Sequence, residues 1–347
     1  MLLSALSAPA TQSVQWLSTV HNFGAIHEDM GNITAEFRFV NTGDEDISIV
    51  AARATCGCTA PQYSKKSVAP GDTSEVTVSF NPTLRPGRFS KKVYVDFSYP
   101  DSRTSLEIKG TVIGTPATLE GRYPVDAGAI RLSRGAVMFG ETRKDKVRNV
   151  MIDGYNASTD SVTPTFADMP AYMQAVSSPE IVAPGVNFVL SFYFDSSKCP
   201  LYGFVSDSLR VRTSSENTVT LPAMAIVTED FSRLTPGEVR KAPVAELSAD
   251  ALDAGKIRRA DGAVSLSFRI TNAGQNKLEI RRIYTTDSGV DVSCGESSLR
   301  KGHSAEVTVT VDPGAVAGDY VSGIVNVITN DPNRPVQKVR VAAELTE

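Results

Sequence analysis

Hydrophobic and polar residues alternate with a period of two along much of the chain. Val76, Val78 and Phe80 lie at alternate positions, and the residues between them are polar. The same alternation recurs in residues 93–97, 264–270 and 307–311. A period of two is typical of β-strands with one face in a hydrophobic core and the other in water, and helical periodicity is scarce. The pattern therefore predicts an all-β protein.

Short landmarks occur three times along the chain, in the same order and at nearly constant spacing. Asn41, Asn156 and Asn272 are 115 and 116 residues apart. Two sets of glycines keep similar spacings, namely Gly71, Gly185 and Gly302, and then Gly87, Gly203 and Gly318. Internal repetition of this kind indicates homologous structural units. We therefore expect three domains in tandem.

The strands within each repeat are short, and clusters of Gly, Pro, Asn and Asp separate them. This arrangement predicts three tandem immunoglobulin-like antiparallel β-sandwich domains, each with about seven strands in two sheets. We place the domains at residues 11–114, 115–229 and 230–347. The Asn-x-Gly and Pro-Gly elements are predicted turns, because glycine readily adopts positive φ. The long, charged link at residues 228–243 predicts a hinge before the last domain.

The first residues resemble the end of a secretory signal peptide. Leu2, Leu3 and Leu6 precede the small residues Ala8 and Ala10, which fit a cleavage site. Residues 1–10 are therefore expected to be a signal-peptide remnant, and the protein to be periplasmic, exported or at the cell surface. A lipid anchor is expected only if the true N-terminus lies upstream, because no cysteine follows closely.

The charge and hydropathy of the chain exclude two classes of partner. A formal net charge of −4 argues against a nucleic-acid binder that works through a broad basic field. No segment approaches the roughly 18 apolar residues of a membrane-spanning helix. We expect neither nucleic acid nor a transmembrane segment.

Several motifs of the first repeat carry a family resemblance. They are "HNFGAI" at residues 21–26, "FRFVNTGDEDISI" at 37–49, "ATCGCTAP" at 54–61 and "VAPGDTSEVTVSFNP" at 68–82. In this order they resemble a bacterial immunoglobulin-like family of unknown function with an HDFGxI, NxG, CGCT and PG pattern. That family is similar to the ASH/Hydin and major sperm protein β-sandwiches. The resemblance implies the fold and export, but no activity, and the other two repeats lack the cysteine pair.

The motif Cys56-Gly57-Cys58 has three interpretations. Two small, unbridged cysteines suit a bend between sheets, and free cysteine is often buried. The pair also suits a strained, reducible bridge or exchange site, or two ligands of a soft metal ion. Two thiolates alone leave a metal site incomplete, so Cys56 and Cys58 are weak metal candidates and we predict no cofactor. Cys199 and Cys294 are scattered, so we expect no regular disulfide framework.

Basic residues surround Pro86-Gly87. Arg85, Arg88, Lys91 and Lys92 are predicted to form a basic hairpin, to which Lys65 and Lys66 add. One interpretation is a weak contact with an anion or polysaccharide. The other is that these charges solvate the edge of the hairpin and prevent it from pairing with another strand. We retain Arg85, Arg88, Lys91 and Lys92 as the candidate interaction residues.

No catalytic arrangement is visible in the sequence. The chain has only His21, His27 and His303, too few for an easily assembled nucleophile–base relay, and the usual hydrolase and phosphate-binding motifs are missing. A metal bound by His21 and His27 is an alternative to a structural role for these residues. A hydrolase would need paired carboxylates, but turns explain the available ones equally well, which are Asp44, Glu45, Asp46, Asp195 and Asp312.

Repetition without catalytic residues favours a structural role. We predict a non-enzymatic, exported, three-domain rod that serves as a binding or spacer module of the bacterial cell envelope. Sandwich domains in a string present loops and open sheet edges for docking, so the expected partner is a protein or an envelope polymer. The alternative is a thiol-redox or soft-metal protein that uses Cys56-Gly57-Cys58.

Overall fold

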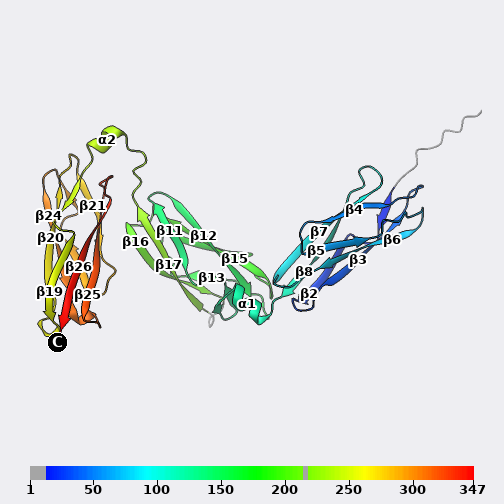
Figure 1. Ribbon diagram of the computed structural model, residues 1–347, viewed down its shortest axis with the longest axis horizontal. Helices are drawn as coiled ribbons and strands as arrows, with labels where there is room; N and C mark the ends of the chain where they lie inside the picture. The colour runs from blue at the N-terminus through cyan, green and yellow to red at the C-terminus, as the bar shows by residue number, and fades with distance from the viewer. Residues whose placement is uncertain (1–12, 214–217) are drawn as a thin grey trace, which may run out of the picture.

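The computed structural model describes residues 13–213 and 218–347, and the signal-peptide remnant predicted at residues 1–10 lies outside them. Figure 1 shows three sandwiches in succession along the chain. In the first domain, one sheet has the order β1 (Val14–Trp16), β3 (Ile33–Asn41), β6 (Thr73–Phe80) and β5 (Thr59–Tyr63). The facing sheet has the order β2 (Val20–His27), β8 (Thr104–Ile113), β7 (Gly87–Phe97) and β4 (Ile49–Ala54).

The second and third domains repeat this plan. The second domain pairs the sheet β14 (Met173–Ser178), β15 (Asn187–Asp195), β12 (Val147–Asn156), β10 (Ile130–Leu132) and β9 (Val125–Ala127) with the sheet β11 (Val137–Arg143), β17 (Thr218–Thr228), β16 (Gly203–Arg212) and β13 (Thr165–Ala167). The third pairs the sheet β18 (Ala245–Leu247), β20 (Val264–Asn272), β24 (Ser304–Val311) and β22 (Val290–Cys294) with the sheet β19 (Ala251–Arg258), β26 (Val336–Thr346), β25 (Tyr320–Thr329), β21 (Leu278–Tyr284) and β23 (Ser298–Leu299). The predicted fold class is confirmed.

One strand pair in each domain is parallel, although we predicted antiparallel sheets. These pairs are β2 with β8, β11 with β17, and β19 with β26. Each has a register shift beside a glycine with positive φ, which is Gly24, Gly140 or Gly255. The sequence pattern did not reveal the direction, because parallel and antiparallel strands both place alternate residues on one face.

Each domain has its own hydrophobic core between its two sheets. Val76, Val78 and Phe80 are at most 1% exposed, and Val307, Val309 and Val311 are completely buried in the third domain. The predicted alternation of core and solvent positions is thus confirmed in these strands.

A completely buried asparagine closes one end of each sandwich. The side-chain amide of Asn41 donates hydrogen bonds to the carbonyl oxygens of Glu45 at 2.8 Å and Val68 at 2.9 Å, and its Oδ1 accepts one from the backbone N–H of Gly43 at 3.0 Å. Asn156 and Asn272 make the equivalent three contacts in their own domains. All three side chains are 0% exposed.

The role that we predicted for the Asn-x-Gly elements is wrong in its mechanism. Among the described residues, positive φ occurs at Gly71, Gly185 and Gly302 of the Pro-Gly and Lys-Gly turns, but not at Asn41 or Gly43. The asparagine acts through its side chain, which satisfies backbone groups that the loop buries. The landmark repeats because each domain must close the same loop.

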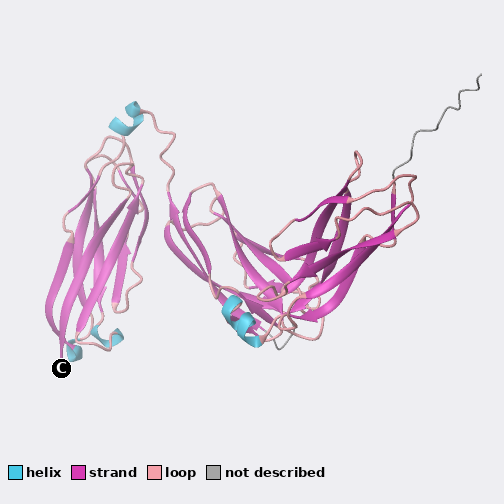
Figure 2. Cartoon of the chain, turned by 45° about the vertical axis from the view of Figure 1, so that its right-hand side comes forward, coloured by secondary structure: helices cyan, strands magenta, loops and turns pink. Residues whose placement is uncertain are grey.

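The links between domains carry short helices. Helix α1 (Pro116–Arg122) follows the first domain, and α2 (Pro236–Arg240) precedes the third. Figure 2 shows both helices outside the sandwiches, together with the short 3₁₀ turns Arg259–Asp261 and Pro313–Ala315 of the third domain. Over the residues that the structure describes, no helix is long and apolar enough to cross a bilayer.

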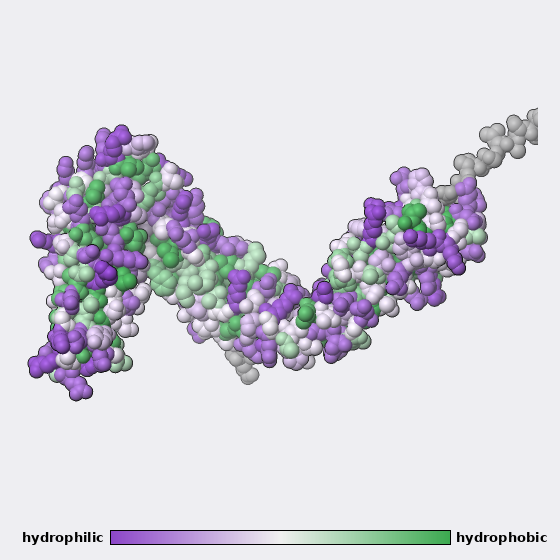
Figure 3. Space-filling model, viewed as in Figure 1, coloured by the Kyte–Doolittle hydropathy of each residue, from purple (hydrophilic) through white to green (hydrophobic). Residues whose placement is uncertain are grey.

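The three domains are not collinear, so the rod that we predicted is bent. Figure 1 shows the chain bending where the first domain meets the second and again where the second meets the third. Hydrophilic residues are spread over all three domains on the visible face, with hydrophobic ones between them (Figure 3). The contacts at the two bends are therefore the features that set the arrangement of the domains.

Candidate functional site

A buried carboxylate fastens the first domain to the link that follows it. Glu28, which comes directly after β2, is only 4% exposed. Its Oε1 accepts hydrogen bonds from the hydroxyls of Thr115, at 2.6 Å, and Thr118. Thr115 is the N-cap of α1, where a negative charge interacts favourably with the free backbone N–H groups. Glu28 therefore fixes the start of α1 against the first domain.

Tyrosines of the second domain complete this first junction. Tyr123 and Tyr155 are nearly completely buried and stack with their ring centroids 5.8 Å apart. The backbone N–H of Gly114 donates to the hydroxyl of Tyr155 at 3.5 Å. Gly87, with φ of 108°, lies against the side chain of Asn187, and the amide of Asn187 occupies the space that a Cβ would need. This close approach explains why the first repeat has glycine at position 87.

The Glu28 contact makes the first junction sensitive to acid. Burial alone would raise the pKa of Glu28, but hydrogen bonds from Thr115 and Thr118 outweigh it and lower the pKa below the usual 4.5. The charged form therefore favours the docked junction above pH 4.5, and this contribution is lost as the pH falls through the lowered pKa. We expect the distance between the first two domains, measured by pulsed EPR, to become more heterogeneous on acidification. A Glu28→Gln variant that shows the same acid response would contradict this assignment.

The second junction is built from cations and aromatic rings. Arg281 of the third domain forms a bidentate ion pair with Glu229, at 2.9 and 2.7 Å, and lies over the ring of Tyr202. Arg282 donates to the carbonyl oxygens of Tyr202 and Phe204 at 3.1 and 2.7 Å. The predicted hinge is therefore spanned by direct contacts between the second and third domains in addition to the link itself.

Gly203 repeats the role of Gly87 at this second junction. A Cβ at Gly203 would overlap Tyr284 and Ile328 of the third domain. The hydroxyl of Tyr284 also accepts a hydrogen bond from the backbone N–H of Phe204 at 3.0 Å. Gly318, which keeps this spacing in the third domain, lies one residue before the position equivalent in strand register, and a Cβ there would have no neighbouring atom within 4 Å. The repeated glycine thus lies at the end of each domain that meets a following domain.

Cys56 and Cys58 are joined by a disulfide. Of the three interpretations, the structure supports the bridge, and the interpretation as two unbridged cysteines is wrong. Residues 55–58 form a bend between β4 and β5, which brings the two Cα atoms to 5.4 Å, closer than in an extended strand. Both residues are half-buried. Bridged sulfurs are not thiolates, so in this form the pair does not provide ligands for a soft metal ion.

The disulfide has a simple chemical consequence. Cys199 and Cys294 are free, Cys199 being buried and Cys294 partly exposed. We expect a thiol reagent to detect two thiols per chain in the unfolded, non-reduced protein and four after reduction. Four thiols without reductant would show that Cys56 and Cys58 are not bridged, and fewer than two would indicate additional pairing.

The predicted basic hairpin does not exist as a hairpin. Residues 81–86 connect β6 in one sheet to β7 in the other, so they form a crossover between sheets. Arg85 folds back onto this loop and donates to the carbonyl oxygen of Thr83 at 2.7 Å. Arg88 and Lys92 lie on the solvent face of β7, whereas Lys91 lies on the other face of this strand and is partly buried. Lys65 and Lys66 lie in the connection between β5 and β6, strands of the opposite sheet.

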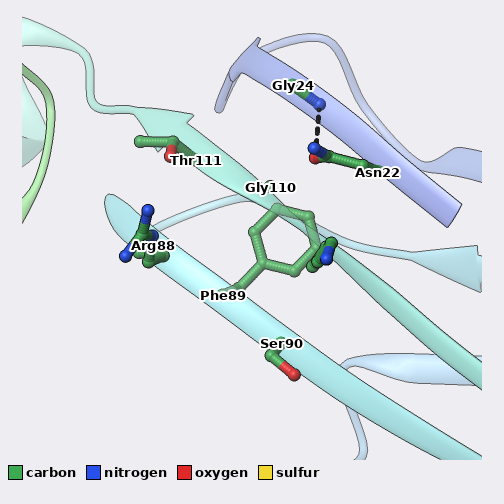
Figure 4. A pocket seen from close by; sticks show the side chains of 8 residues that line it. Asn22, Gly24, Arg88, Phe89, Ser90, Gly110 and Thr111 are labelled. Atoms are coloured by element: carbon green, nitrogen blue, oxygen red, sulfur yellow. Dashed lines mark hydrogen bonds between the residues drawn. The ribbon is translucent and has the colours of Figure 1, made fainter. Parts of the chain in front are cut away.

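Arg88 instead borders an open groove of about 680 Å³ across β2, β7 and β8. Figure 4 shows the lining residues, which are Asn22, Gly24, Arg88, Phe89, Ser90, Lys109, Gly110 and Thr111. The Oδ1 of Asn22 accepts the backbone N–H of Gly24 at 3.0 Å and so stabilises the glycine bulge at the rim. The sequence singled out Arg88, but Lys109 was missed because it lies twenty-one residues away on the neighbouring strand.

The structure does not bring the other candidate residues together into a metal site in the part of the chain that it describes. His21 packs edge-on against Phe23, with centroids 4.5 Å apart, and His27 and His303 are exposed. Within residues 13–213 and 218–347, no group of three potential ligands could hold a metal ion. Asp195 and Asp312 each accept a backbone N–H two residues further on, as turn residues do.

The chain was compared with solved structures and with curated proteins. A protein of unknown function from Porphyromonas gingivalis W83 is 19% identical over 63% of this chain and 100% of its own, with a TM-score of 0.48. The ASH/PapD-like domain 7 of human CEP192 is 16% identical over 33% of this chain and 98% of its own, with a TM-score of 0.25. Titin domains I67–I69 are 11% identical over 98% and 100%, with a TM-score of 0.21. A search of curated proteins found no match.

The family model gives a firmer assignment. The model described as "Protein of unknown function (DUF1573)" matches residues 14–112 and again residues 245–345, which together are more than half of the chain. The first match covers the motifs on which the family resemblance rested. The second covers the third domain, whose sequence keeps fewer of these motifs. The chain belongs to the DUF1573 family of proteins of unknown function.

Proposed function

We propose that this protein is a non-enzymatic, exported spacer of the bacterial cell envelope that holds a binding surface at a set position. The observation that carries the proposal is that both domain junctions are built from specific contacts. A flexible tether would need only a polar linker. Here a buried carboxylate, Glu28, holds the first junction, and a bidentate ion pair between Arg281 and Glu229 holds the second.

The nature of these contacts supports a fixed spacing between domains. Tyr123 and Tyr155 are removed from water at the first junction, and Tyr202 lies beneath the cation Arg281 at the second. Domains of one chain are expected to move relative to one another unless specific contacts hold them. Stacked tyrosines and a hydrogen-bonded carboxylate are directional contacts that favour one arrangement of the domains.

Cell fractionation tests the proposed location. We expect the full-length protein, detected by mass spectrometry at its native level, in the envelope or periplasmic fraction together with an established envelope marker. Recovery with a cytoplasmic marker alone would contradict an envelope role. The free thiols provide a second readout, because a thiol reagent that does not cross the cytoplasmic membrane should label the partly exposed Cys294 in intact cells.

A second candidate function is thiol–disulfide exchange, which the half-buried Cys56–Cys58 bridge favours. A protein dithiol would donate two electrons to this bond, become a disulfide itself, and leave one proton on each of Cys56 and Cys58. A Cys58→Ser variant keeps the Cys56 thiol, which would attack the disulfide form of such a partner, release one partner sulfur as a thiol, and stay joined to the other as a mixed disulfide that no Cys58 thiol can resolve. Absence of any mixed disulfide in an envelope extract, against a Cys56→Ser, Cys58→Ser control, would contradict the exchange function.

A further inference from the structure

The groove on the first domain carries two cations without acidic partners. Arg88 on β7 is paired in register with Thr111 on β8, and Ser90 is paired with Lys109. Arg88 and Lys109 are therefore diagonal neighbours on one face, about 7–8 Å apart at their Cα atoms. Both are exposed, and within the part of the chain that the structure describes neither makes a hydrogen bond or an ion pair through its side chain.

One carboxylate, Glu107, lies beside this pair, two residues before Lys109 on β8, but within the described chain it forms no ion pair with either cation. Glu107 accepts a hydrogen bond from Ser90 at 2.6 Å and lies opposite Lys92 in the register. Lys92 is therefore not counted as part of the site. The positive charge of the groove comes from Arg88 and Lys109.

The fold does not require these cations. The β-bulge in the parallel strand pair gives a common reference point for aligning the three domains residue by residue. It directly follows Asn22, Met138 and Asp253 in the three domains. The positions of Arg88 and Lys109 correspond to Phe204 and Met224 in the second domain and to Tyr320 and Ala342 in the third. Both sister domains fold with uncharged residues there. The two charges are thus specific to the first domain.

The remaining groups of the groove suit hydroxyl-rich ligands. The amide nitrogen of Asn22 and the hydroxyl of Thr111 make no side-chain hydrogen bond within the described chain, and Ser90 keeps lone pairs free to accept one. Phe89 is only 7% exposed, so its ring belongs to the core. The groove therefore lacks the apolar anchor on which protein interfaces usually depend.

We propose that this groove binds an anionic polysaccharide, with Arg88 and Lys109 contacting its carboxylate or sulfate groups and Asn22, Ser90 and Thr111 its hydroxyls. The inference rests on the proposed envelope role and names the chemical class of its ligand. Two exposed cations give modest affinity that falls as salt is raised, because counter-ions screen surface charges. A polymer would gain further affinity from repeated engagement of the same groove.

Binding of the full chain to alginate, a polyuronate, tests this proposal by calorimetry at low salt. We expect binding to alginate and none to neutral dextran. The Arg88→Gln, Lys109→Gln variant should bind about tenfold more weakly. Lys65→Gln, Lys66→Gln removes the same charge from exposed loop residues of the opposite sheet and should leave the affinity unchanged within about twofold.

Three results would overturn the assignment. They are no binding of alginate, equal weakening by the control pair, and binding of poly-L-glutamate as tight as that of alginate. The last result would indicate an acidic protein segment as the partner. Circular dichroism of each variant separates loss of binding from loss of fold. Failure of alginate to bind would remove this ligand class, whereas the proposed spacer role depends on the junctions and is tested separately by scattering.

Discussion

Replacing Asn41 by alanine is expected to destabilise the first domain by about 3–5 kcal/mol, because three buried hydrogen bonds are lost together. The substitution leaves the carbonyl oxygens of Glu45 and Val68 and the N–H of Gly43 without their present partner. The side chain is 0% exposed, so water does not replace these bonds without opening the end of the sandwich. Few single substitutions in the domain should have a larger effect on its stability.

The single tryptophan of the chain makes this prediction specific to one domain. Trp16 lies in β1 of the first domain, with its ring 5.0 Å from that of Phe39 and 6.2 Å from that of Phe97. Its fluorescence during urea denaturation should report unfolding of the first domain. Asn41→Ala should shift this transition to lower urea, whereas Asn156→Ala, the same change in the second domain, should move it little.

A surface asparagine provides the matched control for the same chemical change. Asn81 is exposed, and its Oδ1 accepts only the backbone N–H of Thr83 at 3.0 Å. Asn81→Ala should cost about 1 kcal/mol or less. If Asn41→Ala shifted the Trp16 transition no further than Asn81→Ala does, the buried amide would not be closing the sandwich.

Replacing Glu28 by alanine is expected to loosen the first junction by about 2 kcal/mol, the second largest effect that we predict. The hydroxyls of Thr115 and Thr118 lose a charged acceptor, and the start of α1 loses a neighbouring negative charge. The first domain keeps its core, since Glu28 lies at the end of β2. The change should therefore appear as a wider range of domain orientations, with little change in the unfolding of either domain.

Pulsed EPR between the first two domains measures this effect. Spin labels attached through a non-natural amino acid at Lys65 and Glu180, both exposed, leave the four native cysteines untouched. The distance distribution should be narrow in the parent protein and broad in Glu28→Ala. Glu120→Ala is the control, because Glu120 lies on α1, is exposed, and makes no side-chain hydrogen bond or ion pair within the described residues. Equal broadening by both substitutions would contradict a specific role for Glu28.

Much of the fold could be predicted from the sequence because it depends on local periodicity. The alternation of Val76, Val78 and Phe80 with polar residues reports directly which face of β6 is buried. The threefold spacing of Asn41, Asn156 and Asn272 reports the number of domains. Both patterns can be read from the sequence alone, because a strand has a period of two and homologous domains keep similar lengths.

The features that escaped prediction depend on contacts between distant residues. Glu28 meets Thr115 and Thr118 only after the link folds back on the first domain, and Arg281 reaches Glu229 fifty-two residues away. The Cys56–Cys58 bridge was one of three interpretations, and the sequence did not decide between them because the spacing alone does not show how close the bend brings the two Cα atoms. One signal was available but misread. Asparagine was retained at all three landmarks even where the following glycine was not, which indicates a side-chain role.

Small-angle X-ray scattering of the intact chain tests most directly whether the two junctions set the arrangement of the domains. The account predicts that the curve calculated from this bent arrangement, as one conformation, fits the measured curve, and that Glu28→Ala degrades the fit. A curve typical of a compact particle, or one that only a broad ensemble of domain orientations reproduces for the parent protein, would contradict it.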